Sequence, residues 1–235
     1  MFSMKYEKIT HCTSIVVMPE KNVYVYKLLT MERMVKIENS ENTHAVLCAS
    51  AFNNVVAFPS EKQGYVHLLF LDPGSMKQVK AHDGVIRQLA LNRDGTKLAT
   101  ASVKGTVIRV IDTAALKVIQ EVRRSIDPAT IYALMFNQHS SFFVCCSEKG
   151  TVHIFAHKSD QKQDAGYVAK FSEMVGYGNY DRSVATFKGP ETASLCCFGM
   201  EDNSVIGMLL QTGILKIFFC LFSVCSKWSK FKDFI

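Results

Sequence analysis

The chain has 235 residues, of which 48% are hydrophobic and 20% charged, and its formal net charge is +6. This composition is ordinary for a folded globular protein and excludes an intrinsically disordered one. The basic balance favours an anionic partner, but +6 spread over 235 residues is also common in proteins that bind nothing acidic, so charge alone assigns no function.

Cysteine usage indicates a reducing compartment. None of the eight cysteines forms a C-x-x-C pair, so we expect no zinc or other metal, and no cofactor. The adjacent pairs Cys145-Cys146 and Cys196-Cys197 lie in apolar runs, which predicts small buried side chains on strands.

Neither apolar run near the ends of the chain predicts a targeting or membrane-spanning segment. Residues 15–18 are too few for a secretory signal and are followed by Pro19. Residues 214–225 are interrupted by Lys216 and fall short of the roughly 20 residues that a spanning helix needs. We therefore expect a soluble cytosolic protein.

A short strand pattern recurs along the chain. Its starts are 42, 41, 45 and 63 residues apart, and the five copies occupy residues 22–26, 64–68, 105–109, 150–154 and 213–217. A period of about 40 to 45 residues with several short strands per unit is typical of propeller blades. The last interval is longer, which places an insertion between the fourth and fifth copies.

Each repeat has the same internal order of strands and turns. Residues 89–102 contain an apolar strand, an Asp94-Gly95 turn and a second strand, and Lys104-Gly105 then turns into the third. Residues 132–147 repeat this layout, and long amphipathic helical stretches are absent from the sequence. We predict an all-β fold, a β-propeller of WD-repeat type with about five to six blades in this chain.

Two consecutive arginines, Arg123 and Arg124, lie between two near-copies of one motif, at residues 102–109 and 147–154. Successive side chains of an extended strand point to opposite faces, so the two arginines can serve two different pockets. Two basic pockets indicate a ligand that carries phosphates.

These motifs resemble the PROPPINs, seven-bladed WD-repeat-like propellers of the WIPI type, from about residue 20 to residue 218. Family members usually carry Leu or Phe before the doublet and Gly after it, where this chain has Val122 and Ser125. The resemblance implies a non-catalytic effector that binds phosphatidylinositol 3-phosphate and phosphatidylinositol 3,5-bisphosphate and recruits autophagy-related or endolysosomal partners to membranes.

The resemblance also implies two sets of site residues. The first phosphoinositide site is expected to contain His82, Ser102, Gly105, Thr106, Arg109 and Arg123, and the second Arg124, Ser147, Thr151 and His153. Guanidinium groups and hydroxyls suit the oxygens of a phosphomonoester. Taken singly, Ser102, Thr106, Ser147 and Thr151 fit better as residues that cap turns or pair across strands, as in most propellers. His67 occupies the position of His153 in an earlier repeat that has no doublet beside it.

The resemblance places a membrane-insertion loop in the long insertion. Its aromatic and apolar residues are Tyr167, Val168, Phe171, Met174, Val175 and Tyr177. Exposed rings bracketed by cations suit an anchor at headgroup depth. The alternative is that residues 167–171 and 184–187 are ordinary strands and only the polar segment before them forms a loop.

The main competing hypothesis is a propeller scaffold that binds proteins but no lipid, with the arginines in salt bridges to Glu121, Asp127 or Glu148. Exposed arginines beside hydroxyls would weaken it. Catalytic motifs are absent from the sequence and the basic residues are scattered, so we expect neither an enzyme nor nucleic-acid binding.

We expect a single propeller domain over residues 1–235, with a loop insertion near 157–183 and an atypical tail at 219–235. The chain is expected to be a family member shortened at both ends, cytoplasmic and peripheral on preautophagosomal or endolysosomal membranes.

Overall fold

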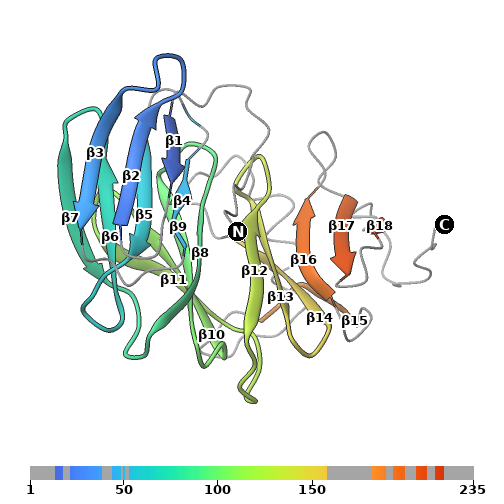
Figure 1. Ribbon diagram of the computed structural model, residues 1–235. Helices are drawn as coiled ribbons and strands as arrows, with labels where there is room; N and C mark the ends of the chain where they lie inside the picture. The colour runs from blue at the N-terminus through green and yellow to red at the C-terminus, as the bar shows by residue number, and fades with distance from the viewer. Residues whose placement is uncertain are drawn as a thin grey trace. The chain divides into compact units, whose positions relative to one another are not determined.

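A computed structural model of the chain describes residues 14–17, 22–38, 44–48, 50, 53–157, 182–188, 193–198, 205–210 and 215–219. These residues form strands β1 to β18, arranged in five sheets, and they contain no helix (Figure 1). The all-β prediction is confirmed, and the five sheets agree with the five repeats in the sequence.

The chain divides into two compact units, Met1–Ser102 with Arg109–Ile119, and Val103–Ile108 with Gln120–Ile235. Within unit 1, one sheet contains β1 (Ser14–Val17), β2 (Asn22–Lys27) and β3 (Arg33–Glu38), and another contains β4 (Val46–Leu47), β5 (Val55–Pro59), β6 (Tyr65–Phe70) and β7 (Ser75–Lys80). A third sheet contains β8 (Ile86–Leu91), β9 (Lys97–Ser102), β10 (Val107–Asp112) and β11 (Lys117–Arg123). The start of β10, residues 107–108, and the end of β11, residues 120–123, belong to unit 2.

Unit 2 contains the remaining two sheets. One is formed by β12 (Ile131–Phe136), β13 (Phe142–Ser147), β14 (Thr151–Ala156) and β15 (Ala185–Lys188), and the other by β16 (Ala193–Phe198), β17 (Val205–Leu210) and β18 (Leu215–Phe219). In every sheet the spatial order of the strands follows the chain, which produces antiparallel meanders. The recurring sequence pattern corresponds to β2, β6, β10, β14 and β18.

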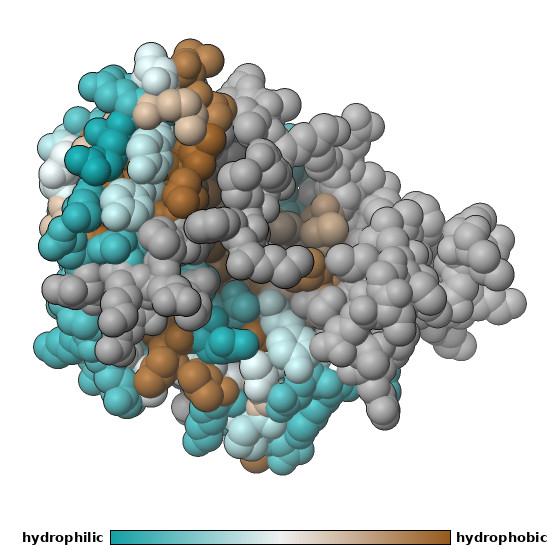
Figure 2. Space-filling model, in the orientation of Figure 1, coloured by the Kyte–Doolittle hydropathy of each residue, from teal (hydrophilic) through white to brown (hydrophobic). Residues whose placement is uncertain are grey.

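The central strands of the four-stranded sheets form the core. Five of the six residues of β13 are buried, and β9 has the same pattern, so these strands are continuous apolar or small-residue runs instead of alternating ones. The outer strand β7 has a single buried residue, Val79, and Figure 2 shows a mostly hydrophilic surface over β3 and β7. Each buried Val, Leu or Ile side chain contributes about 1.5–3 kcal/mol to folding.

The cysteine prediction is largely confirmed in the described residues. Cys48, Cys145, Cys146 and Cys196 are buried thiols that form no disulfide, whereas Cys197 is exposed. Burial raises the pKa of the Cys145 thiol to about 12, so this side chain stays protonated and packs in the core as a small apolar group.

Candidate functional site

The arginine doublet lies at the end of the outer strand β11. Arg123 is its last residue and is half-buried, and Arg124 follows it with a side chain that is only 7% exposed. Burial lowers the pKa of the Arg124 guanidinium from its ordinary value, yet an arginine stays protonated at neutral pH. Unit 2 therefore holds a buried positive charge at the start of the β11–β12 loop.

Backbone carbonyls hold the Arg124 guanidinium in place. Its Nε donates to Gly105 O at 2.7 Å and its Nη2 donates to Asp127 O at 2.6 Å. The Arg124 backbone N–H donates to Thr106 O at 2.9 Å, which fixes the main chain beside the β9–β10 turn. A guanidinium has five N–H donors, so these side-chain bonds leave three without a hydrogen bond to the described residues.

Two polar groups with no internal partner accompany this cation. Ser147 ends β13 and Thr151 begins β14, and His153 lies two residues further along β14. Ser147 Oγ and His153 Nδ1 are buried and make no hydrogen bond within the described part of the chain. Buried polar atoms nearly always have a partner, so an unsatisfied pair is a feature that needs a reason.

His153 is neutral at physiological pH. Burial, and then the positive charge of Arg124, lower the pKa of His153 to about 4. The ring lies against Phe155, with centroids 6.1 Å apart and an angle of 14° between the planes. A neutral imidazole with an Nδ1 proton can donate a hydrogen bond to an anion without adding a second buried charge.

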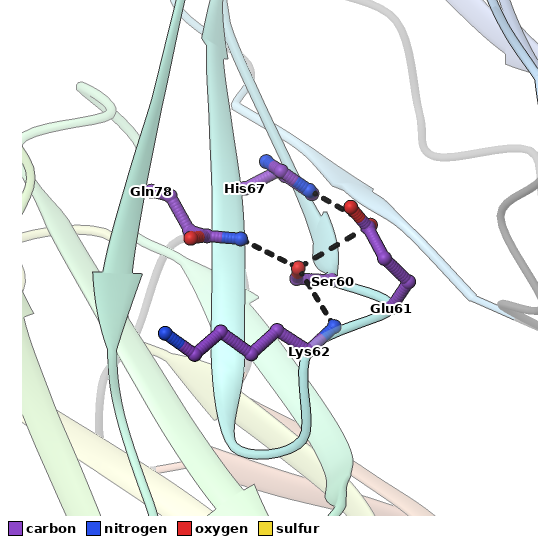
Figure 3. Close-up of polar contacts among 5 residues, drawn as sticks. All are labelled: Ser60, Glu61, Lys62, His67 and Gln78. Atoms are coloured by element: carbon purple, nitrogen blue, oxygen red, sulfur yellow. Dashed lines mark hydrogen bonds and ion pairs between the residues drawn. The ribbon is translucent and has the colours of Figure 1, made fainter.

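An earlier repeat, two before this one, carries the same residue types in a different arrangement (Figure 3). Ser60, Glu61, Lys62 and His67 correspond in sequence to Ser147, Glu148, Lys149 and His153. Ser60 Oγ accepts from Gln78 Nε2 at 2.6 Å and from the Lys62 backbone N–H at 3.1 Å. The Glu61 carboxylate lies 3.3 Å from Ser60 Oγ and 3.2 Å from His67 Nε2. In this cluster the Ser60 hydroxyl has internal partners and Glu61 supplies an anion, whereas His67 Nδ1, like His153 Nδ1, is buried without a hydrogen bond to the described residues.

The corresponding carboxylate in unit 2 is bound elsewhere. Glu148 accepts hydrogen bonds from the backbone and side chain of Thr130, which hold the pKa of its carboxyl below the ordinary value. Asp127 pairs through its carboxylate with Lys149, at 4.0 Å, and offers Arg124 only its carbonyl. The Arg124 side chain thus donates to backbone carbonyls and not to the carboxylates that the salt-bridge hypothesis would require. It is, however, buried and not exposed as the lipid-binding hypothesis expected.

The residues predicted for the first site fall into both units and are described unit by unit. In unit 1, His82 is buried with Nε2 3.0 Å from Thr100 Oγ1, Arg109 Nη1 donates to Ala81 O at 2.7 Å, and Ser102 is buried. In unit 2, Thr106 is buried, Gly105 has a positive φ of 62°, and Arg123 is half-buried.

The predicted insertion-loop residues Tyr167, Val168, Phe171, Met174, Val175 and Tyr177 lie outside the described residues. Beyond them, β15 pairs with β14, and Val184 N donates to Ile154 O at 2.8 Å. Residues 185–188 are therefore an ordinary blade strand, as the alternative interpretation of the insertion expected for this part.

Sequence reasoning missed the two carbonyl acceptors of Arg124. Gly105 and Asp127 contribute backbone oxygens, which no side-chain pattern reveals, although the Lys-Gly turn before β10 was a usable signal for the first. Among the described residues, no helix is long and apolar enough to cross a membrane. The same residues hold no group of three His, Cys, Asp or Glu side chains that could bind a metal ion.

Repeated antiparallel meanders of three or four short strands define a protein of the β-propeller class. The sequence profile of the PROPPIN family matches residues 6–180, which is most of the chain. The chain therefore belongs to the PROPPIN family.

Named relatives agree with this family. Autophagy-related protein 18e of Arabidopsis thaliana is 30% identical over 200 residues, which cover 82% of this chain and 53% of the plant protein. Autophagy-related protein 18 of Mycosarcoma maydis is 34% identical over 215 residues, which cover 81% of this chain and 44% of the fungal protein. The chain spans about half the length of these curated relatives.

Solved structures show the same fold. The structure of Kluyveromyces lactis Hsv2p matches with a TM-score of 0.71 at 21% identity, covering 88% of this chain and 64% of that one. A complex of KlAtg21 with the coiled coil of AgAtg16 matches with a TM-score of 0.70 at 22% identity, covering 90% and 64%. The propeller prediction is confirmed.

Proposed function

We propose that this protein is a phosphoinositide effector whose second site, formed by Arg124, Ser147, Thr151 and His153, binds the phosphomonoester of an inositol lipid. The observation that carries the proposal is a buried, charged guanidinium accompanied by a hydroxyl and an imidazole nitrogen that have no hydrogen-bond partner among the described residues. A phosphate brings the acceptor oxygens that these donors lack.

The chemistry favours a phosphate ligand over a carboxylate. Three N–H donors of Arg124 remain for a ligand, and a guanidinium binds two phosphate oxygens in parallel. The hydroxyls of Ser147 and Thr151 and the Nδ1–H of His153 suit further oxygens. Because Glu148 is bound to Thr130, the site lacks the internal anion that Glu61 supplies in the repeat of β4 to β7.

The full proposal follows the family. The first site would use His82, Ser102, Gly105, Thr106, Arg109 and Arg123, the inserted loop would contact the bilayer, and the ligands would be phosphatidylinositol 3-phosphate and phosphatidylinositol 3,5-bisphosphate. The protein would be cytoplasmic, peripheral on preautophagosomal or endolysosomal membranes, and would recruit autophagy-related proteins there. The solved KlAtg21 complex supports protein recruitment as a role of such propellers.

Liposome flotation tests the proposal. Wild type should float with vesicles that contain either inositide, and the Arg123→Thr/Arg124→Thr variant should not, because both guanidinium groups are lost. The matched control is Arg87→Thr/Lys117→Thr, which removes two exposed cations elsewhere and should retain flotation. Circular dichroism checks that both variants fold. Flotation of the doublet variant at the wild-type level would refute the proposed binding mechanism.

A further inference from the structure

Two apolar side chains in the segments that hold Arg124 are exposed. Ile126, in the β11–β12 loop, is 83% exposed, and Val103, in the β9–β10 turn, is 53% exposed. Loop positions of this kind usually carry polar residues, and an exposed apolar side chain next to a buried cation is a candidate contact surface. We call Val103 and Ile126 the apolar rim.

Hydrogen bonds connect the apolar rim to the Arg124 site. Ala129 N donates to Lys104 O at 3.2 Å, which ties the β11–β12 loop to the β9–β10 turn. Ile126 is followed directly by Asp127, whose carbonyl accepts from Arg124, and Asp127 N donates to Ser125 Oγ at 3.2 Å. The position of Ile126 is therefore set by the same backbone that holds the guanidinium.

Cations flank the apolar rim. Lys104, next to Val103, is exposed, and Lys149, whose side chain is 49% exposed, pairs with the Asp127 carboxylate at 4.0 Å. Apolar tips bracketed by lysines suit the boundary of an anionic bilayer, where the cations meet headgroups and the apolar groups enter the acyl layer. A lipid whose headgroup occupies the Arg124 site would necessarily extend its glycerol and chains out of that site toward the bilayer.

We propose that Ile126 and Val103 enter the interfacial layer of an anionic bilayer when the Arg124 site holds a lipid headgroup. This inference rests on the proposed function and adds a membrane contact within the described residues, separate from the inserted loop. The site supplies recognition of the headgroup, and the apolar rim supplies partitioning of the protein into the membrane. Loss of the apolar rim therefore weakens binding to vesicles without weakening binding to a water-soluble headgroup.

The test compares two double variants. Ile126→Ser/Val103→Ser removes the apolar rim, and Leu29→Ser/Met31→Ser removes two apolar side chains that are 95% and 59% exposed in the β2–β3 turn. Flotation uses phosphatidylcholine vesicles with phosphatidylserine and phosphatidylinositol 3-phosphate, and calorimetry uses inositol 1,3-bisphosphate. The rim variant should bind vesicles about ten-fold more weakly. It should bind the soluble headgroup like wild type, and the control variant should match wild type in both assays.

A second measurement reports directly how deep residue 126 enters the bilayer. Ile126→Trp in a Trp228→Phe background should be quenched by brominated lipids when vesicles are added, whereas Leu29→Trp in the same background should not. Unchanged vesicle binding of the rim variant, equal losses in both assays, or an equal loss in the control would each overturn the inference. Wild type that binds neither vesicles nor soluble headgroup would overturn the proposed function, and the inference with it. Wild type that binds both, with an unquenched Ile126→Trp, would overturn only the inference.

Discussion

At the residue scale, Ser147 has a buried hydroxyl that makes no hydrogen bond within the described residues of unit 2. The variant Ser147→Ala therefore removes a desolvation penalty and no internal bond. We expect the free energy of unfolding to change by less than about 0.5 kcal/mol, or to rise. Binding of inositol 1,3-bisphosphate should weaken measurably, because a ligand contact is lost.

Ser60→Ala is the matched control for this prediction. Ser60 Oγ accepts from Gln78 and from the Lys62 backbone, so its removal should cost about 1 kcal/mol of stability while ligand binding stays unchanged. Urea unfolding measures the stability of both variants, and calorimetry measures their binding of inositol 1,3-bisphosphate. A loss of stability in Ser147→Ala equal to that in Ser60→Ala would mean that Ser147 has a structural role.

The contrast between His153 and His67 marks what the sequence could not predict. Both follow a Gly-x-Val segment on the third strand of a four-stranded sheet, and both come after a Ser-Glu-Lys sequence. The difference depends on where one carboxylate lies, since Glu61 contacts His67 and Glu148 contacts Thr130. Such rotamer choices are decided by tertiary neighbours, so residue identity predicted the candidates but not their hydrogen-bonding state.

At the scale of the element, the β9–β10 turn supports the Arg124 site. Gly105 has φ of 62°, and a Cβ added there would lie 1.9 Å from Ala129 O. Gly105→Ala therefore combines a left-handed backbone with a clash against the loop that follows Arg124. We expect a loss of about 3 kcal/mol of stability, with weakened ligand binding because Gly105 O can no longer accept from Arg124 in its present position.

The variant Gly74→Ala separates the cost of the left-handed backbone from the cost of the steric clash. Gly74 has φ of 63° but no atom within 4 Å of an added Cβ, so only the backbone term applies. We expect a loss of about 1 kcal/mol and wild-type ligand binding. Thermal unfolding of both variants checks the difference. Equal losses in the two variants would show that the approach of Gly105 to Ala129 is not a tight contact.

Strands with local signals were predictable, and outer strands were less so. The Asp94-Gly95 and Lys104-Gly105 turns bound β9 on both sides, and both glycines have the positive φ that such turns require. In contrast, β7 has one buried residue and no alternation, so its polar sequence does not distinguish it from a loop. Its place as the last strand of its sheet follows from the repeat and not from its own residues.

At the scale of the whole molecule, the repeat of about 40 residues was enough to predict the class of fold. A single repeat is too small to bury its own apolar faces, so it must stack against other repeats. The period could not predict which repeat binds a ligand, since all five repeats share it. What distinguishes one repeat is the arginine doublet at the end of β11 and the buried groups that follow it in unit 2.

The two proposed sites make a prediction about surface density. If each site holds one lipid, the second binding event on a vesicle is intramolecular, and affinity rises through avidity and not through a tighter single contact. Vesicle binding should then increase with roughly the second power of the inositide mole fraction for wild type, and roughly the first power for Arg124→Thr. Flotation across a series of mole fractions measures both exponents. A first-power dependence in wild type would mean that one site accounts for all of the binding, and a second-power dependence retained in Arg124→Thr would mean that Arg124 serves neither site.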